Sequence, residues 1–250
     1  DGRFPNHIPN PENEEAMRSA CAATVKAGAD LGVIFDTDVD RAGAVLSDGT
    51  ELNRNRIIAM MAAILLREHP GTTIVTDSIT STGLAAFIRK HGGVHHRFKR
   101  GYRNVINESM RLNREGHDSQ LAMETSGHGA LKENYFLDDG AYLVTRLLIE
   151  LARAKKEGYT LESLIADLAE PAESKEFRMN ILVPDFKAYG QKIIDELNVY
   201  AASQPGWSVA PDNFEGVRVN LDKAHGDGWF LLRLSLHDPL IPLNIESDSV

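Results

Sequence analysis

Residues 31–41 read LGVIFDTDVDR, and the interpretation of the chain starts from them. The first five residues are mostly apolar and partly β-branched, which predicts a short buried strand. Three aspartates follow at every second position, Asp36, Asp38 and Asp40, and Arg41 closes the run. Carboxylates this close repel one another unless a cation lies among them, and Mg²⁺ prefers such oxygen ligands. The stretch therefore predicts a magnesium site at the carboxyl end of a strand, with a solvated acidic turn as the alternative.

The composition is that of an ordinary globular protein. The chain has 250 residues, 42% hydrophobic and 25% charged, which is long enough for two or more domains. A net charge of −9 argues against a nucleic-acid partner, and no apolar run approaches the roughly 18 residues that span a membrane. The single cysteine, Cys21, fits a reducing compartment. We therefore expect a cytoplasmic protein without nucleic-acid or membrane partners; because the chain begins at Asp1, an organelle such as the plastid stays open.

Strand and helix patterns alternate over the first hundred residues. Apolar residues recur at helical spacing through 53–69, and 72–77 is a short apolar run typical of a buried strand. A hairpin with an Asp48-Gly49 turn is expected at 42–53. Alternation of this kind indicates crossover units on a parallel or mixed sheet, and hence an α/β fold. The further helices expected here cover 12–27 and 81–90.

The densest basic cluster is HHRFKRGYR at 95–103. We interpret it as a surface loop, because it is too short and too poor in interleaved aromatic residues for a nucleic-acid platform. A basic loop that faces the acidic loop suits an anionic small substrate. A solvated surface turn without a ligand is the alternative.

A polar loop, ETSGHG at 124–129, follows a short apolar strand. Glu124 and Ser126 are two residues apart and can bind vicinal hydroxyls of a sugar. His128 can exchange a proton near neutral pH, and the glycines let the backbone approach a ligand closely. The alternative is a loop whose polar residues cap the helix that starts near Asp139.

The last third of the chain predicts a smaller α+β unit. Leucines at helical spacing indicate a helix over 141–156, and the charged, proline-containing stretch EPAESKE (170–176) is the expected domain linker. Arg233 and Ser235 lie at the end of the last expected strand, where a forked guanidinium and a hydroxyl can bind a phosphate. An incidental polar strand end is the alternative. The other elements expected here are a short helix at 161–169, a helix at 185–202, and strands at 177–183, 216–219 and 228–236.

Taken in order, these motifs resemble one family. The chain is similar to the α-D-phosphohexomutases, the phosphomannomutase/phosphoglucomutase superfamily, in having FDTDVDR, then ETSGHGALKEN with DDGAY, then RLSLHDP. The opening FPNHIPNPEN is also similar to a segment of that family. The resemblance covers essentially the whole chain and implies mixed-sheet α/β domains followed by a smaller α+β C-terminal domain. In that family four domains surround a central cleft. The chain would hold the end of the second domain with the metal loop (1–50), the third, sugar-binding domain (51–172) and a truncated fourth, phosphate-binding domain (173–250).

The resemblance also implies roles for individual residues. The Mg²⁺ ligands of the family are matched by Asp36, Asp38 and Asp40. The catalytic positions are matched by Arg41 and His128. The substrate-binding positions are matched by Arg103, Glu124, Ser126 and Lys132. The phosphate-binding loop is matched by Arg233, Ser235 and His237, although Leu236 and His237 stand where the family commonly has glycine or asparagine followed by threonine.

The family interconverts hexose 1-phosphates and hexose 6-phosphates through a phosphoserine and a hexose 1,6-bisphosphate, so the resemblance implies glucose or mannose phosphates as substrates. The family's phosphoserine loop, a Thr-x-Ser-His-Asn-Pro-like motif, does not occur in this sequence. We therefore expect a part of a longer mutase that is inactive without its N-terminal domains. Two alternatives stay open: a haloacid-dehalogenase-like phosphatase with Asp36 as nucleophile, and a non-catalytic sugar-phosphate binder. The choice between glucose and mannose also stays open.

Overall fold

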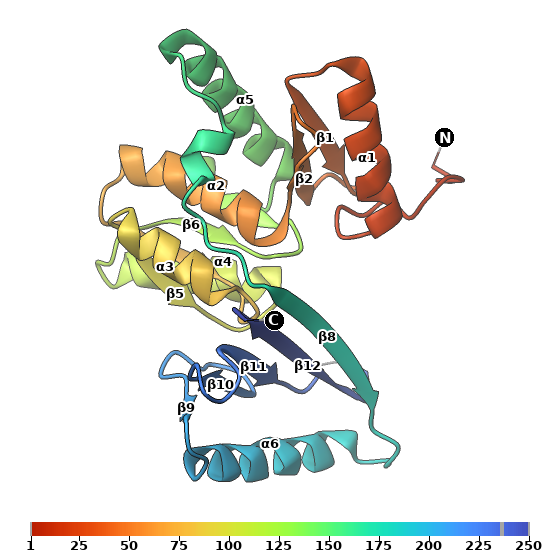
Figure 1. Ribbon diagram of the computed structural model, residues 1–250, viewed down its shortest axis with the longest axis vertical. Helices are drawn as coiled ribbons and strands as arrows, with labels where there is room; N and C mark the ends of the chain where they lie inside the picture. The colour runs from red at the N-terminus through yellow and green to blue at the C-terminus, as the bar shows by residue number, and fades with distance from the viewer. Residues whose placement is uncertain (1, 236–237, 250) are drawn as a thin grey trace.

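The computed structural model describes residues 2–235 and 238–249, and these form three β-sheets with helices packed against them (Figure 1). Helix α1 (Glu14–Ala27) packs on the first sheet. Asn13 caps α1 by accepting a hydrogen bond from a backbone N–H of its first turn, and Gly28 ends it with φ 60°. The first sheet is antiparallel, in the order β1 (Leu31–Phe35), β2 (Ala42–Leu46) and β3 (Glu51–Leu52).

The second sheet is mixed. Its strands lie in the order β5 (Val94–Arg97), β4 (Thr73–Thr76), β6 (Ser119–Met123) and β7 (Gly129–Leu131). The first three are parallel, and β7 is antiparallel to β6. The helices of this region are α2 (Arg54–Glu68), α3 (Thr82–Lys90), α4 (Tyr102–Arg114), α5 (Gly140–Glu157) and the short 3-10 helices η1 (Lys132–Asn134) and η2 (Glu162–Ile165). The α/β class with mixed sheets is therefore confirmed.

Side-chain alternation explains why helices cover both faces of this sheet. Ile74 and Leu121 pack with residues of α2, α3 and α5 in one core. Val75 and Ala122, the next residues along the same strands, pack with Val105 of α4 on the opposite face. Helix α2 is almost wholly buried because it packs between α3 and α5 over the sheet (Figure 1).

The third sheet is antiparallel throughout and carries α6 (Phe186–Ala202) on one face (Figure 1). Its core contains Ile194 of α6 together with Val217, Val219 and Leu232. The smaller α+β C-terminal region is thus present as expected. Its strands lie in the order β8 (Glu173–Asn180), β12 (Leu240–Ser247), β11 (Gly228–Leu232), β10 (Val217–Leu221) and β9 (Trp207–Val209). In the described part of the chain, no helix combines the length and the apolarity needed to cross a membrane.

Two stretches expected to be loops contain strands. The expected linker 170–176 contributes its last four residues to β8, which pairs with β12 over eight residues, so the strand predicted at 177–183 starts earlier. Because β8 is a sheet edge that is exposed along most of its length, its many charged side chains resemble those of a loop. The basic cluster 95–103 likewise begins within β5. Its Arg97 is buried and paired with Asp212 at 2.6 Å, rather than solvated.

The sequence pattern also missed β9 and β12. β12 contains Pro242, although it lies between β8 and β11 inside the sheet. Proline cannot donate to a strand ladder and is usually confined to edges, so its presence concealed this strand. The strand predicted at 228–236 ends at Leu232, and Arg233 lies in the segment that follows it.

Arginine side chains attach the third sheet to the second. Arg218 of β10 is 2% exposed, and its guanidinium carbon lies 3.5 Å from the centroid of the Trp229 ring. Its Nη1 donates to the backbone carbonyl of Ser78 at 2.9 Å. The ion pair between Arg97 and Asp212 crosses the same boundary. Because a buried cation is costly unless it is paired or stacked, these contacts bind the two sheets in one arrangement.

We expect the stability of the third sheet to depend on pH through Glu246. Its carboxylate accepts a hydrogen bond from Trp229 Nε1 at 2.7 Å, yet burial raises the pKa of Glu246 from 4.5 to about 7. Because the pKa of Glu246 is higher in the folded than in the unfolded state, the protonated carboxyl group favours folding. This stabilisation is complete below the unfolded pKa of 4.5 and is lost as the pH rises through about 7. The free energy of unfolding should therefore fall by up to about 3 kcal/mol across this range.

Urea unfolding of wild type and Glu246→Gln, at pH values below and above this range, measures the effect. The variant keeps an acceptor for Trp229 but cannot ionise, so its stability should vary less with pH by that amount. Glu196→Gln, on the exposed side of α6, is the matched control and should follow the wild type. The same pH dependence in wild type and Glu246→Gln would contradict this role of Glu246.

Candidate active site

The acidic loop joins β1 to β2 and folds around Asp36. Arg41 donates to both carboxylate oxygens of Asp36, from Nε at 2.6 Å and from its backbone N–H at 3.2 Å. Burial alone would raise the pKa of Asp36, but the hydrogen bonds from Arg41 outweigh it and hold the pKa below its ordinary value. Asp40 is in the opposite situation, because burial and the neighbouring Asp36 raise its pKa to about 6.

The three aspartates predicted from their spacing converge. Carboxylate oxygens of Asp36, Asp38 and Asp40 lie within 4.8 Å of one another. Asp40 Oδ1 is buried and has no hydrogen-bond partner among the described residues. A hard divalent cation would satisfy that oxygen and reduce the repulsion among the three charges. The residue set therefore fits Mg²⁺.

A second loop, residues 124–129, is hydrogen-bonded directly to the acidic loop. The Ala42 N–H donates to the Gly127 carbonyl at 3.1 Å, and Arg41 and His128 form an isolated β-bridge. The close approach requires glycine, because a Cβ at position 127 would lie 2.7 Å from the Ala42 carbonyl oxygen. Two motifs that are far apart in the sequence are thus adjacent in the structure.

His128 connects the two loops electrostatically. Its Nδ1 lies 2.8 Å from Asp138 Oδ2 and 3.6 Å from Asp40 Oδ2. Its ring stacks on Tyr102, with the ring centroids 4.9 Å apart. Burial disfavours the charged ring, but the hydrogen bond to Asp138 and the surrounding carboxylates raise the pKa of His128 above its ordinary value. The imidazole can therefore carry a proton beside the acidic loop near neutral pH.

Glu124 and Ser126 lie together, as expected. Glu124 is 3% exposed, and its Oε1 accepts a hydrogen bond from the Gly101 N–H at 2.5 Å. The Ser126 hydroxyl donates to Glu124 Oε2 at 3.5 Å. Burial, together with the neighbouring Asp77, raises the pKa of Glu124 to about 7. Helix α5 is capped by Asp139 itself, so helix capping does not explain the polar residues of the loop.

Two predicted substrate-binding residues lie at different distances from these loops. Arg103 is exposed in the first turn of α4 and donates from Nε to the Tyr102 hydroxyl at 3.0 Å, so it borders the site through that ring. Lys132 is instead paired with Asp118 at 2.9 Å. Because β7 runs antiparallel to β6, residue 132 lies at the edge where β6 begins, opposite the edge that carries Glu124. The structure does not bring Lys132 to the site.

The predicted phosphate loop follows β11. Arg233 Nε is buried and has no hydrogen-bond partner in the described part of the chain. Burial, together with the nearby charge of Arg100, lowers the pKa of Arg233. The Ser235 hydroxyl accepts a hydrogen bond from the Asp238 N–H at 3.2 Å, and His237 lies outside the described residues. A guanidinium nitrogen without a partner, beside a second arginine, is suited to bind an anion.

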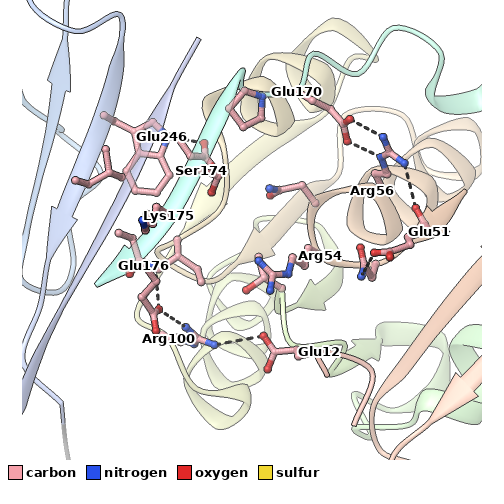
Figure 2. A pocket seen from close by; sticks show the side chains of 18 of the residues that line it. Glu12, Glu51, Arg54, Arg56, Arg100, Glu170, Ser174, Lys175, Glu176 and Glu246 are labelled. Atoms are coloured by element: carbon pink, nitrogen blue, oxygen red, sulfur yellow. Dashed lines mark hydrogen bonds and ion pairs between the residues drawn. The ribbon is translucent and has the colours of Figure 1, made fainter. Parts of the chain in front are cut away.

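Arg100 was not singled out in the sequence, where it is one of several residues in a basic cluster. Among the described residues its guanidinium forms two long ion pairs, 3.8 Å to Glu12 and 3.9 Å to Glu176 (Figure 2). It lines a cavity of about 790 Å³ that also reaches Thr125 of the polar loop. Arg54 lines the same cavity with φ 47°, and its side chain makes no hydrogen bond or ion pair with the described residues. No sequence pattern marks its backbone conformation.

Comparison with known proteins identifies the family. Residues 1–49 match the family model described as phosphoglucomutase/phosphomannomutase, alpha/beta/alpha domain II, and residues 53–171 match domain III. A phosphoglucomutase of Neisseria gonorrhoeae is 31% identical over 250 residues, which cover 100% of this chain and 50% of that protein. A phosphomannomutase/phosphoglucomutase of Pseudomonas putida is 34% identical over 251 residues, with the same coverage of 100% and 50%. The crystal structure of a phosphoglucomutase/phosphomannomutase family protein from Burkholderia thailandensis matches with a TM-score of 0.80 and 31% identity, over 100% of this chain and 49% of that one.

The chain belongs to the α-D-phosphohexomutase superfamily, and within it to the phosphoglucomutase/phosphomannomutase family. The superfamily predicted from the order of the motifs is thereby confirmed. The chain spans about half the length of the curated relatives it matches.

Proposed function

We propose that this chain is the metal-binding and sugar-binding part of a phosphoglucomutase or phosphomannomutase, within a longer polypeptide that supplies a phosphoserine. The observation that carries the proposal is the hydrogen-bonded junction of the acidic loop with the 124–129 loop, through Ala42, Gly127 and His128. This junction supports the proposal because it joins the loop that carries the three aspartates to the loop that carries Glu124, Ser126 and His128. In the complete enzyme, the serine phosphate would pass to one sugar hydroxyl and a phosphate would return from the other position, through a hexose 1,6-bisphosphate.

Each group has a role that its surroundings support. The three aspartates would hold Mg²⁺, which offsets the charge that develops on a transferred phosphoryl group. Arg41, fixed by Asp36, adds positive charge at the same place. His128 would give or take the proton of the reacting hydroxyl, since its pKa is raised and it faces the acidic loop. Glu124 and Ser126 would bind the sugar hydroxyls.

The phosphate that does not react would be bound on the third sheet. Arg233 and Ser235 are its proposed ligands, with His237 of the same loop, and Arg103 is a proposed contact at the rim. We assign no substrate contact to Lys132, because it is engaged with Asp118 at the far edge of the sheet.

We also propose a division of the chain into three domain parts. Residues 1–50 would complete the second domain of the mutase, residues 51–172 would form the third, and residues 173–250 would belong to the fourth. The ends of the two family matches, at residues 49 and 171, are compatible with this division, as is the separate third sheet that starts at Glu173.

The phosphatase alternative has less support from the geometry. A nucleophilic carboxylate needs an oxygen that faces the substrate, whereas both oxygens of Asp36 accept hydrogen bonds from Arg41 and the residue is 6% exposed. Trapping of an aspartyl-phosphate that is lost in Asp36→Asn would establish this alternative against the mutase.

The proposed function is tested with the 250-residue chain itself. We expect no turnover of glucose 1-phosphate or mannose 1-phosphate with Mg²⁺ and glucose 1,6-bisphosphate, because no serine phosphate is present. We expect calorimetric binding of at least one of the two hexose 6-phosphates, weakened roughly ten-fold in Ser126→Ala by the loss of a hydroxyl contact. Ser208→Ala, at an exposed position of β9, is the matched control.

Each outcome of this experiment has a definite meaning. Rapid turnover by the chain alone would show that nothing essential is missing from it. Failure to bind either hexose phosphate would overturn the assignment of the sugar site. Binding without turnover by a polypeptide that includes every mutase domain would favour a sugar-phosphate binder over an enzyme.

A further inference from the structure

Asp77 is a fully buried carboxylate beside the proposed sugar loop. It follows β4 directly, with a side chain that is 0% exposed. β4 and β6 are parallel and in register at Thr76 and Met123, so the next residues, Asp77 and Glu124, leave the sheet side by side. Two adjacent parallel strands therefore end in two adjacent buried carboxyl groups. The sequence offered no sign of this, because the aspartate that follows β4 looks like an ordinary strand terminator.

The contacts of Asp77 lead directly into the 124–129 loop. Its Oδ2 accepts a hydrogen bond from the Thr125 hydroxyl at 2.8 Å, and Thr125 is itself 5% exposed. The Ser126 hydroxyl is directed to Glu124 instead. Thr125 is thus hydrogen-bonded to Asp77, while its two neighbours in the chain, Glu124 and Ser126, are hydrogen-bonded to each other. Because Thr125 lies between Glu124 and Ser126 in the chain, its hydrogen bond to Asp77 holds the backbone of both residues in place.

Asp77 also interacts electrostatically with four arginines. Asp77 Oδ1 has no hydrogen-bond partner in the described part of the chain. Burial acts to lower the pKa of each of four surrounding arginines, and attraction to Asp77 acts to raise the pKa of every one. Two of them come from the region of the second sheet and two from the region of the third sheet. They are Arg97, Arg100, Arg218 and Arg233.

We infer that Asp77 is a positioning residue of the sugar site: through its hydrogen bond to Thr125 it holds Glu124 and Ser126 in the orientation that binds sugar hydroxyls. The inference rests on the proposed function, since it assigns a support to that same site. Asp77 is not placed to touch the sugar, because it is fully buried and its Oδ2 is occupied by Thr125. A hydrogen bond from a residue at the end of a strand to a loop keeps the ligand-binding side chains of that loop in place.

The test compares sugar-phosphate binding with binding of inorganic phosphate, by calorimetry on the whole chain. The sugar probe is whichever of glucose 6-phosphate and mannose 6-phosphate binds the wild type more tightly. Thr125→Val removes the hydroxyl with little change in size and should lower the affinity for the sugar phosphate roughly ten-fold. Thr125→Ser keeps the hydroxyl and should restore it. The affinity for inorganic phosphate should stay within about two-fold of wild type in both variants, because phosphate alone does not use the 124–129 loop.

A second pair of variants shows whether Asp77 and Thr125 act together. Asp77→Asn keeps an acceptor oxygen but loses the charge, and it should weaken sugar-phosphate binding less than Thr125→Val does. In the double variant Asp77→Asn/Thr125→Val, the preference for sugar phosphate over inorganic phosphate should be no lower than in Thr125→Val alone. The hydrogen bond through which Asp77 acts is already absent in Thr125→Val. Melting temperatures of all variants show that the compared proteins are folded.

The outcomes separate this inference from the proposed function. If the wild type binds sugar phosphates no better than inorganic phosphate, the proposed sugar site is wrong. If the wild type shows the preference and Thr125→Val keeps it, the site stands and the positioning role of Asp77 is overturned. That role is also overturned if Thr125→Ser binds as weakly as Thr125→Val, or if Asp77→Asn and Thr125→Val reduce the preference additively.

Discussion

Replacing Asp38 by asparagine is expected to lower the affinity of the chain for Mg²⁺ by at least about ten-fold, while leaving its stability almost unchanged. Asp38 is the most exposed of the three aspartates in the acidic loop, and within the described chain its side chain has one weak contact, from the Thr37 hydroxyl at 3.4 Å. Its charge should therefore matter for the proposed cation site and for little else. Calorimetric titration with Mg²⁺, and urea unfolding without metal, measure the two quantities separately.

Two comparison variants sharpen this prediction. Asp30→Asn removes an exposed carboxylate just before β1 and should leave Mg²⁺ affinity at the wild-type value. Asp36→Asn should lower both Mg²⁺ affinity and stability, because the Asp36 carboxylate also holds Arg41 through two hydrogen bonds. Equal Mg²⁺ affinity in wild type and Asp38→Asn would remove Asp38 from the cation site and leave the acidic loop as a solvated turn.

The parts of the site that could be predicted from the sequence are those carried by short local motifs. Asp36, Asp38 and Asp40 follow one another within a single turn after β1, so their convergence depends on local geometry alone. Glu124 and Ser126 are likewise close in sequence, and the Ser126 hydroxyl lies 3.5 Å from Glu124 Oε2. In both cases spacing along the chain was sufficient, because no distant element had to be placed correctly.

The residues that sequence reasoning missed depend on distant partners. Asp77 gains its position from the register of β4 with β6, and Arg100 from pairing with Glu12 and Glu176, which are far from it in the chain. Arg218 looks like an ordinary strand residue until Trp229 stacks on it. A single sequence without its fold gives no indication of which charge meets which.

The strands that were predicted wrongly from the sequence also depend on distant partners. β8 is rich in charged residues, but it pairs along its whole length with β12, which was itself not predicted. β5 contains two histidines and Arg97, yet it pairs in parallel with β4. In each case a neighbouring strand, rather than the alternation of apolar residues, determines the extended conformation. The helices were predicted more closely because their apolar spacing is a property of one segment.

Replacing Gly127 by alanine is expected to destabilise the chain by about 4 kcal/mol and to separate the two loops of the candidate site. Gly127 has φ +99°, in the left-handed region that favours glycine. An added Cβ would lie 2.7 Å from the carbonyl oxygen of Ala42, and that neighbour is backbone, which cannot rotate away. The Ala42 N–H donates to the Gly127 carbonyl at 3.1 Å, so any movement that relieves the clash also breaks the junction.

Gly116→Ala is the matched control for this prediction. Gly116 has φ +88°, but no atom lies within 4 Å of the place where its Cβ would be, so the variant carries the backbone strain without the clash. It should lose about 1–2 kcal/mol of unfolding free energy and keep the Mg²⁺ affinity of the wild type. Gly127→Ala should lose more stability and also bind Mg²⁺ more weakly, because the 124–129 loop supports Asp40 through His128. If both variants lose the same stability and keep the same Mg²⁺ affinity, the backbone junction does not hold the acidic loop, and the two motifs are neighbours without being one site.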